Sequence, residues 1–269
     1  MSVYFPPKAY KDLSFLNSSA ARNIRILCEF DEPRERLARE GVKDTVVFFG
    51  SARIRSAEEL ADLERTATDA GDTARLDQIH RLQRLTPYYD AARELSRRLT
   101  EWNLTRPNRD YLVATGGGPG IMAAANQGAS EVEGGRSLGL GISLPFEQGI
   151  NSFVPPELGF EFHYFFTRKF WFVYMAKALV IFPGGFGTLD EMFETLTLVQ
   201  THKIEKHIPV VLFGRDYWDR VINMDVMAEY GTIAPQDPQM VFRTDSVDEA
   251  FDYLVRELLS AEAAGHGPA

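Results

Sequence analysis

Two glycine-rich turns, each between an apolar run and a helical pattern, constrain the fold of this chain most strongly. YLVATGGG (111–118) leads into a helical pattern at 119–130, and ALVIFPGG (178–185) leads into another at 188–200. The rest of the chain also alternates strand-like runs with helical segments. Such alternation predicts an α/β protein with a parallel sheet that is covered by helices on both faces.

Apolar and β-branched runs predict strands at 45–50, 111–118, 137–144, 178–185, 208–214 and 240–245. Helical periodicity predicts helices at 18–39, 119–130, 168–177, 188–200, 217–231 and 246–262, with two or three more over 56–102. Gly71 is expected to end the first helix of that stretch, and Pro87 to start the last. In the helix at 18–39 we expect Pro33 to introduce a kink or a break.

These patterns predict three parts of the chain: an N-terminal arm and helix over 1–42, a single α/β domain over 43–262, and a flexible tail over 263–269. The charge-rich stretch at 56–86 is interpreted as a solvated helical insertion in that domain. In the N-terminal helix, an apolar stripe is expected to contain Ile24, Leu27 and Cys28 and to extend to Leu37.

The charge balance limits the possible partners. The chain has 29 Lys and Arg against 38 Asp and Glu, a net charge of −9, which argues against binding to a nucleic-acid polymer or an anionic membrane. The single cysteine, Cys28, excludes a disulfide framework, and the five histidines lack metal-site spacing. The longest apolar stretch is too short to cross a bilayer. We therefore expect a cytoplasmic protein without a metal or another cofactor.

The two glycine turns predict a site for a phosphorylated small molecule. In an open parallel sheet, ligands bind at the carboxyl ends of the strands, and a helix N-terminus offers N–H groups to a phosphate. Neither turn has the pattern of a dinucleotide-binding site with a ribose-binding acid, and neither is a P-loop.

The second turn, PGGFGTLDEMFE (183–194), leaves two roles open for Glu191. Thr188 and Glu191 have the T-x-x-E spacing of a capping box, in which Glu191 would only close the helix on itself. Alternatively, Glu191 faces the ligand from the floor of the pocket. Asp190 is interpreted as a favourable charge in the first helical turn.

GGGPGIMAAANQGA, then TRK, then PGGFGTLDE resemble the LOG family, phosphoribohydrolases that release free cytokinin bases from their nucleotides. Members of this family have often been labelled lysine decarboxylases. The resemblance covers about 43–262 except the insertion, and is closest to the longer bacterial branch with an N-terminal helical extension. It implies a Rossmann-like, doubly wound fold and a homodimer with the active site near the subunit interface. It also implies hydrolysis of nucleoside 5′-monophosphates, such as AMP or cytokinin nucleotides, to base and ribose 5-phosphate.

The resemblance assigns the catalytic roles to Arg168 and Glu191. The residues that it assigns to substrate and phosphate binding are Gly50, Ser51, Gly117, Gly118, Pro119, Gly120, Met122, Lys169, Gly184, Gly185, Gly187 and Thr188. Phe165 and Phe166 stand where many plant-type members have Met-His, a change that replaces a polar group by an aromatic wall and leaves the preferred base open.

Two other functions remain as alternatives at this stage. One is a nucleotide-binding protein without catalysis, whose extra helices contact a partner. The other, amino-acid decarboxylation, is disfavoured because no lysine lies in a recognisable context for pyridoxal phosphate. His163 is expected to be packed or solvated. The aromatic stripe, namely Phe165, Phe170, Phe172 and Tyr174, is expected to belong to the core or a dimer interface.

Overall fold

A parallel sheet forms the centre of the protein. The computed structural model describes residues 3, 5–108, 111–144 and 149–264, and within them seven strands pair in the order β4–β3–β2–β1–β5–β6–β7, all parallel. The strands are β1 (Asp44–Phe49), β2 (Tyr111–Thr115), β3 (Ser137–Ile142), β4 (Gly159–Phe162), β5 (Ala176–Ile181), β6 (Val210–Phe213) and β7 (Val241–Thr244).

The strand order confirms the Rossmann-like, doubly wound sheet. Successive strands from β1 to β4 extend the sheet in one direction, and β5 returns to the other side of β1. The order therefore reverses between β1 and β5, and the carboxyl ends of these two strands form the topological switch point. The two glycine turns follow β2 and β5, and β5 is one of the two strands at that point.

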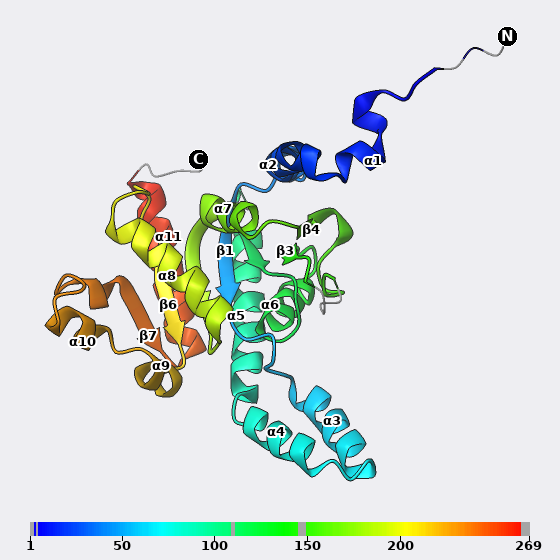
Figure 1. Ribbon diagram of the computed structural model, residues 1–269. Coiled ribbons are helices and arrows are strands. Elements are labelled where there is room, and N and C mark those ends of the chain that lie inside the picture. The colour runs from blue at the N-terminus through cyan, green and yellow to red at the C-terminus, as the bar shows by residue number, and fades with distance from the viewer. Residues whose placement is uncertain (1–2, 4, 109–110, 145–148, 265–269) are drawn as a thin grey trace.

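Helices cover both faces of the sheet. Successive side chains of β1 point to opposite faces, and they are buried on both. Val46 and Phe48 pack into one core, and Val47 and Phe49 into the other. The first core is closed by α5 (Thr86–Thr105), α6 (Ile121–Ser130) and α11 (Val247–Ala263). The second is closed by α7 (Phe165–Met175), α8 (Phe186–Gln200), α9 (Arg215–Val221) and α10 (Met224–Glu229) (Figure 1).

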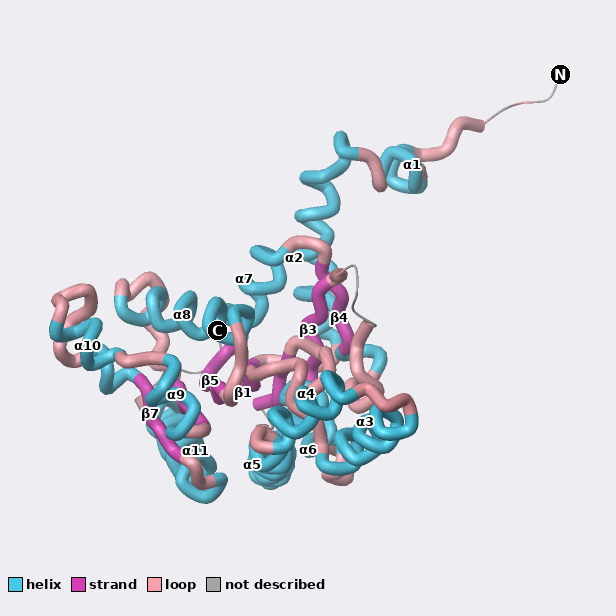
Figure 2. The backbone as a smooth tube through the Cα atoms, turned by 60° about the horizontal axis from the view of Figure 1, so that its bottom comes forward, coloured by secondary structure: helices cyan, strands magenta, loops and turns pink. Residues whose placement is uncertain are grey.

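Two helical additions extend from this body. At the N-terminus, α1 (Leu13–Leu16) and α2 (Arg22–Arg39) lead away from the sheet (Figure 2). The insertion forms a hairpin of α3 (Ala57–Asp69) and α4 (Thr73–Gln83) with a small core of its own, built on Leu60, Ala67 and Ile79. Gly71, at φ +65°, lies in the turn of the hairpin, as predicted, and α5 has its proline in the first turn.

The structure corrects several predicted boundaries. Strand β4 was not predicted, because four residues starting at a glycine show no clear strand pattern. The segment at 217–231 is two helices, since Asn223 caps a new one. Pro33 lies inside α2 without dividing it. The expected apolar stripe is buried only at Leu37, which is 3% exposed, whereas Ile24 is 40% exposed, Leu27 is 59% exposed and Cys28 is exposed.

The C-terminal helix α11 ends at Ala263, and most of the tail predicted at 263–269 lies outside the described residues. No helix in the described part of the chain is long and apolar enough to span a membrane.

Candidate active site

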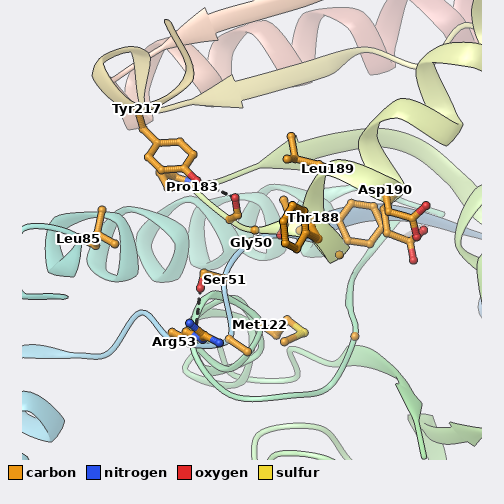
Figure 3. Close-up of a pocket in the computed structure, with 18 of the residues that line it drawn as sticks. Gly50, Ser51, Arg53, Leu85, Met122, Pro183, Thr188, Leu189, Asp190 and Tyr217 are labelled. Carbon is orange, nitrogen blue, oxygen red and sulfur yellow. Dashed lines mark hydrogen bonds between the residues drawn. The ribbon is translucent and has the colours of Figure 1, made fainter. Parts of the chain in front are cut away.

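A cleft of about 750 Å³ opens at the switch point between β1 and β5. Figure 3 shows Gly50 and Ser51, which follow β1, opposite the turn that joins β5 to α8. Nine of the predicted site residues line this cleft: Gly50, Ser51, Met122, Arg168, Gly184, Gly185, Gly187, Thr188 and Glu191. The structure therefore brings together most of the positions predicted from three separate motifs.

Backbone hydrogen bonds hold the walls of the cleft together. The N–H of Ser51 donates to the carbonyl of Pro183 at 3.0 Å, and the N–H of Ile121 donates to the carbonyl of Ser51 at 3.2 Å. Gly120 has φ +72°, and a β-carbon there would lie 2.3 Å from the Ser51 carbonyl oxygen. Glycine at 120 thus allows the loop after β1 to contact the start of α6.

The turn before α8 presents backbone N–H groups to the cleft. Helix α8 begins at Phe186 with Gly185 as its N-cap and no side-chain cap, and the first N–H groups of a helix have no intrahelical acceptor. Thr188 lies in the first helical turn, where its side chain fills the space beside Gly184. The alternative in which Thr188 and Glu191 form a capping box does not hold: the helix starts two residues before Thr188, so Thr188 is not its N-cap.

Glu191 lies in the wall of the cleft and is only 7% exposed. Burial raises the pKa of its carboxyl to about 7, although Arg168 and Lys169 lower it. A carboxyl with this pKa is half ionised at neutral pH. Of the two positions that the sequence left open for Glu191, the structure shows the one in the wall of the cleft.

Arg168 reaches the cleft from α7. Its Nε donates to the carbonyl of Leu140 at 2.7 Å, and its guanidinium lies 5.2 Å from the ring centre of Phe172. These contacts hold the side chain to β3 and to its own helix. Arg168, from α7, and Glu191, from α8, both line the same cleft.

Five of the predicted residues lie outside the lining of the cleft. The carbonyls of Gly117 and Gly118 accept hydrogen bonds from Asn151 Nδ2 at 3.0 and 3.1 Å. These two, together with Pro119 and Gly120, shape the loop that precedes α6. Lys169 forms ion pairs of 2.8 Å with Asp190 and Glu194. Burial lowers the pKa of Lys169, but its interactions with the two carboxylates raise it overall.

The sequence did not reveal the opposite end of the cleft. Arg53, Leu82, Leu85 and Tyr217 line it, and Tyr217 Oη donates to the carbonyl of Gly184 at 2.7 Å (Figure 3). Leu82 and Leu85 come from the end of the helical insertion, so this addition contributes to the site. Of these four residues, Arg53 was the easiest to predict from the sequence, because it lies two residues after Ser51.

The aromatic stripe divides between different environments. Phe172 is buried, and Phe165 is half exposed and lines the cleft. Phe170 and Tyr174 are also half exposed and stack with ring centres 5.2 Å apart. The side chain of His163 is exposed, with its ring edge against Tyr164. Among the described residues, no group of three or more His, Cys, Asp or Glu could hold a metal ion.

Comparisons with known proteins agree on one family. The family described as "Possible lysine decarboxylase" matches residues 122–254, which include Met122, Arg168 and Glu191. The chain is 32% identical over 170 residues to the cytokinin riboside 5′-monophosphate phosphoribohydrolase LOG2 of Arabidopsis thaliana, covering 58% of this chain and 74% of that protein.

It is 28% identical over 176 residues to the probable cytokinin riboside 5′-monophosphate phosphoribohydrolase LOGL3 of Oryza sativa subsp. japonica, covering 63% of this chain and 76% of that protein. Among solved structures, the Moco carrier protein of Chlamydomonas reinhardtii is 20% identical, with 81% of this chain and 98% of that chain covered and a TM-score of 0.45.

Proposed function

The chain belongs to the LOG family, and on that premise we propose that it hydrolyses a nucleoside 5′-monophosphate to free base and ribose 5-phosphate. AMP and N6-modified adenine nucleotides of the cytokinin type are the proposed substrates. The observation that carries this proposal is the cleft itself, which combines a buried carboxyl of raised pKa, an arginine and the N-terminus of a long helix.

In the proposed reaction the bond between C1′ of the ribose and the base nitrogen breaks, and an oxygen of water bonds to C1′. The base leaves with the bonding electron pair and gains a proton, and the water loses one. Positive charge develops on the ribose in the transition state, as in other glycoside hydrolysis. The ionised carboxylate of Glu191 is proposed to stabilise this charge and to orient or deprotonate the attacking water.

The phosphate is proposed to lie at the N-terminus of α8, against the N–H groups of its first turn. Arg53, across the cleft on the loop after β1, is exposed, and among the described residues it forms no ion pair. We assign it the role of a second phosphate ligand. Arg168 is proposed to orient the ribose and phosphate, since its planar donors match anionic oxygens.

The experiment is to incubate the purified protein with AMP and with N6-isopentenyladenosine monophosphate and to separate the products by chromatography. Free base is the expected product from at least one of them. Glu191→Gln is expected to reduce turnover by a factor on the order of 10²–10³. The control is Glu205→Gln, which changes an exposed carboxyl outside the cleft lining. If the protein binds nucleotides but releases base from none of the common ones, the enzymatic function is contradicted and the protein is a nucleotide-binding protein.

We further propose that the chain forms a homodimer. The support is a set of exposed apolar side chains on α7 and α2: Phe166, Phe170, Tyr174, Ile24 and Leu27. Apolar side chains exposed together on neighbouring helices are typical of a protein interface. Sedimentation equilibrium at micromolar concentration is expected to give twice the mass of the chain, and a monomer mass would contradict the proposal.

A further inference from the structure

The N-terminal helix α2 contacts the start of α7, the helix that carries Arg168. The carboxylate of Glu29 on α2 accepts hydrogen bonds from the backbone N–H of His163 at 2.8 Å and of Tyr164 at 3.3 Å. The hydroxyl of Thr167, in the first turn of α7, lies 2.5 Å from Glu29 Oε2. One side chain of α2 thus contacts three donors at the start of α7, two on the residues just before the helix and one in its first turn.

These contacts anchor the segment that leads into α7. Tyr164, the N-cap residue of α7, provides no side-chain cap, and Glu29 accepts from the N–H groups of Tyr164 and of His163 before it. A carboxylate at this position also interacts favourably with the positive end of the helix dipole. Glu29 therefore fixes the start of α7 both by hydrogen bonding and by charge.

Two further contacts hold the second turn of α7. Trp171 Nε1 donates to the backbone carbonyl of Glu29 at 2.9 Å, and the rings of Phe30 and Phe170 meet edge to face at 5.1 Å. Helix α2 consequently holds α7 on both sides of Arg168. Arg168 itself belongs to the first turn, since its N–H donates to the carbonyl of Tyr164 at 3.3 Å.

We propose that Glu29 is a positioning residue, which fixes the first turn of α7 and through it the guanidinium of Arg168 in the cleft. Residue 29 lies outside the segment 122–254 that the family matches, so the N-terminal extension would have a role in the reaction. The expected effect of Glu29 on turnover rests on the proposed function. Its effect on the position of Arg168 rests on the hydrogen bonds alone.

The kinetic test compares Glu29→Ala and Glu29→Gln with the control Glu35→Gln, an exposed carboxyl on the same helix. Glu29→Ala is expected to lower kcat by a factor on the order of 10 to 100 with a smaller change in KM, because the other proposed phosphate ligands, the N-terminus of α8 and Arg53, lie on other elements. Glu29→Gln is expected to fall between the wild type and the alanine variant, since its amide oxygen still accepts one hydrogen bond. Glu35→Gln is expected to match the wild type.

A coupling measurement separates positioning from general destabilisation. In an Arg168→Lys background, Glu29→Ala is expected to lower kcat by a much smaller factor than in the wild type, since the guanidinium that Glu29 positions is no longer present. An equal factor in both backgrounds would overturn the proposal.

A second readout does not depend on activity. The Nε–H of Arg168, assigned by NMR from its loss in Arg168→Lys, donates to Leu140 and is expected to exchange with solvent faster in Glu29→Ala but not in Glu35→Gln. Unchanged exchange would overturn the positioning role. An inactive wild-type protein would overturn only the proposed function, and this exchange measurement would still decide the role of Glu29.

Discussion

The guanidinium of Arg168 occupies the space that a side chain at Gly116 would fill. A β-carbon at Gly116 would lie 2.5 Å from Arg168 Nη2 and 2.8 Å from Met122 Sδ. Gly116 is not among the glycines with positive φ, so backbone conformation does not require glycine at this position. The glycine that follows β2 therefore makes room for the arginine of the cleft.

Gly116→Ala is expected to reduce turnover by a factor on the order of 10², because the methyl group displaces the Arg168 guanidinium. Stability should change little, since both atoms that it meets belong to the ends of flexible side chains. Gly159→Ala is the control, because its β-carbon would be 3.7 Å from its nearest neighbours. Kinetic assays and thermal melts check both variants. If Gly116→Ala turns over at the wild-type rate, the position of Arg168 does not depend on the space that Gly116 leaves.

The pH dependence of the reaction should follow the ionisation of Glu191. Its pKa is raised to about 7 by burial, and the proposed role needs the ionised form. The value of kcat/KM is therefore expected to rise about tenfold between pH 6 and pH 8 and then level off. A profile that is flat in this range, or that falls as the pH rises, would contradict the role of an ionised Glu191.

Glu191 should also affect the free energy of unfolding. Its pKa rises from 4.5, the ordinary value, to about 7 in the folded protein, so folding becomes less favourable as the pH rises through this window. The cost above pH 7 is about 3 kcal/mol at most. Glu191→Gln removes it, and is expected to stabilise the protein more at pH 8 than at pH 5. Denaturant titration at both pH values measures the difference, which should be absent in Glu205→Gln.

The sequence predicted the sheet and the two turns well because their signals are local. An apolar run followed by glycines at 116–118 or 184–185 identifies a buried strand and its turn without reference to the rest of the chain. The start of α7 was placed three residues too late, at 168 instead of 165. Its cap comes from Glu29, more than a hundred residues earlier, and no local pattern could reveal it.

The far end of the cleft was missed for the same reason. Leu82, Leu85 and Tyr217 have ordinary apolar and aromatic surroundings in the sequence. Only the folded chain brings them to one cleft, with Tyr217 bonded to the carbonyl of Gly184. The exposed stripe on α2 was misjudged because helical periodicity shows which residues share a face, but not what covers that face.

Arg53→Ala is expected to raise KM for AMP about tenfold or more with little change in kcat, because a phosphate ligand contributes equally to the ground state and the transition state. Competitive inhibition by ribose 5-phosphate should weaken by a similar factor. Arg34→Ala, which changes an exposed arginine on α2, is the control. If ribose 5-phosphate inhibits Arg53→Ala as strongly as the wild type, Arg53 is excluded as a phosphate ligand.

Phe165 and Phe166 offer a matched pair for base preference. Phe165 lines the cleft, whereas Phe166 is half exposed and contacts Tyr164, with ring centres 5.6 Å apart. Phe165→Ala is expected to change the ratio of kcat/KM for AMP and for N6-isopentenyladenosine monophosphate several-fold, since it removes an apolar surface of the site. Phe166→Ala should leave that ratio unchanged, and an equal effect of both variants would show that base preference does not depend on the position of Phe165 in the cleft lining.

If this cleft breaks an N-glycosidic bond with water, base and ribose 5-phosphate must form in equal amounts. Both products should be quantified together during turnover of each nucleotide, with wild-type protein and with Glu191→Gln. A 1:1 ratio of base to ribose 5-phosphate is expected for the wild type, and strongly reduced amounts of both are expected for the variant. Release of inorganic phosphate without base, or equal product formation by Glu191→Gln, would contradict this reaction in the cleft.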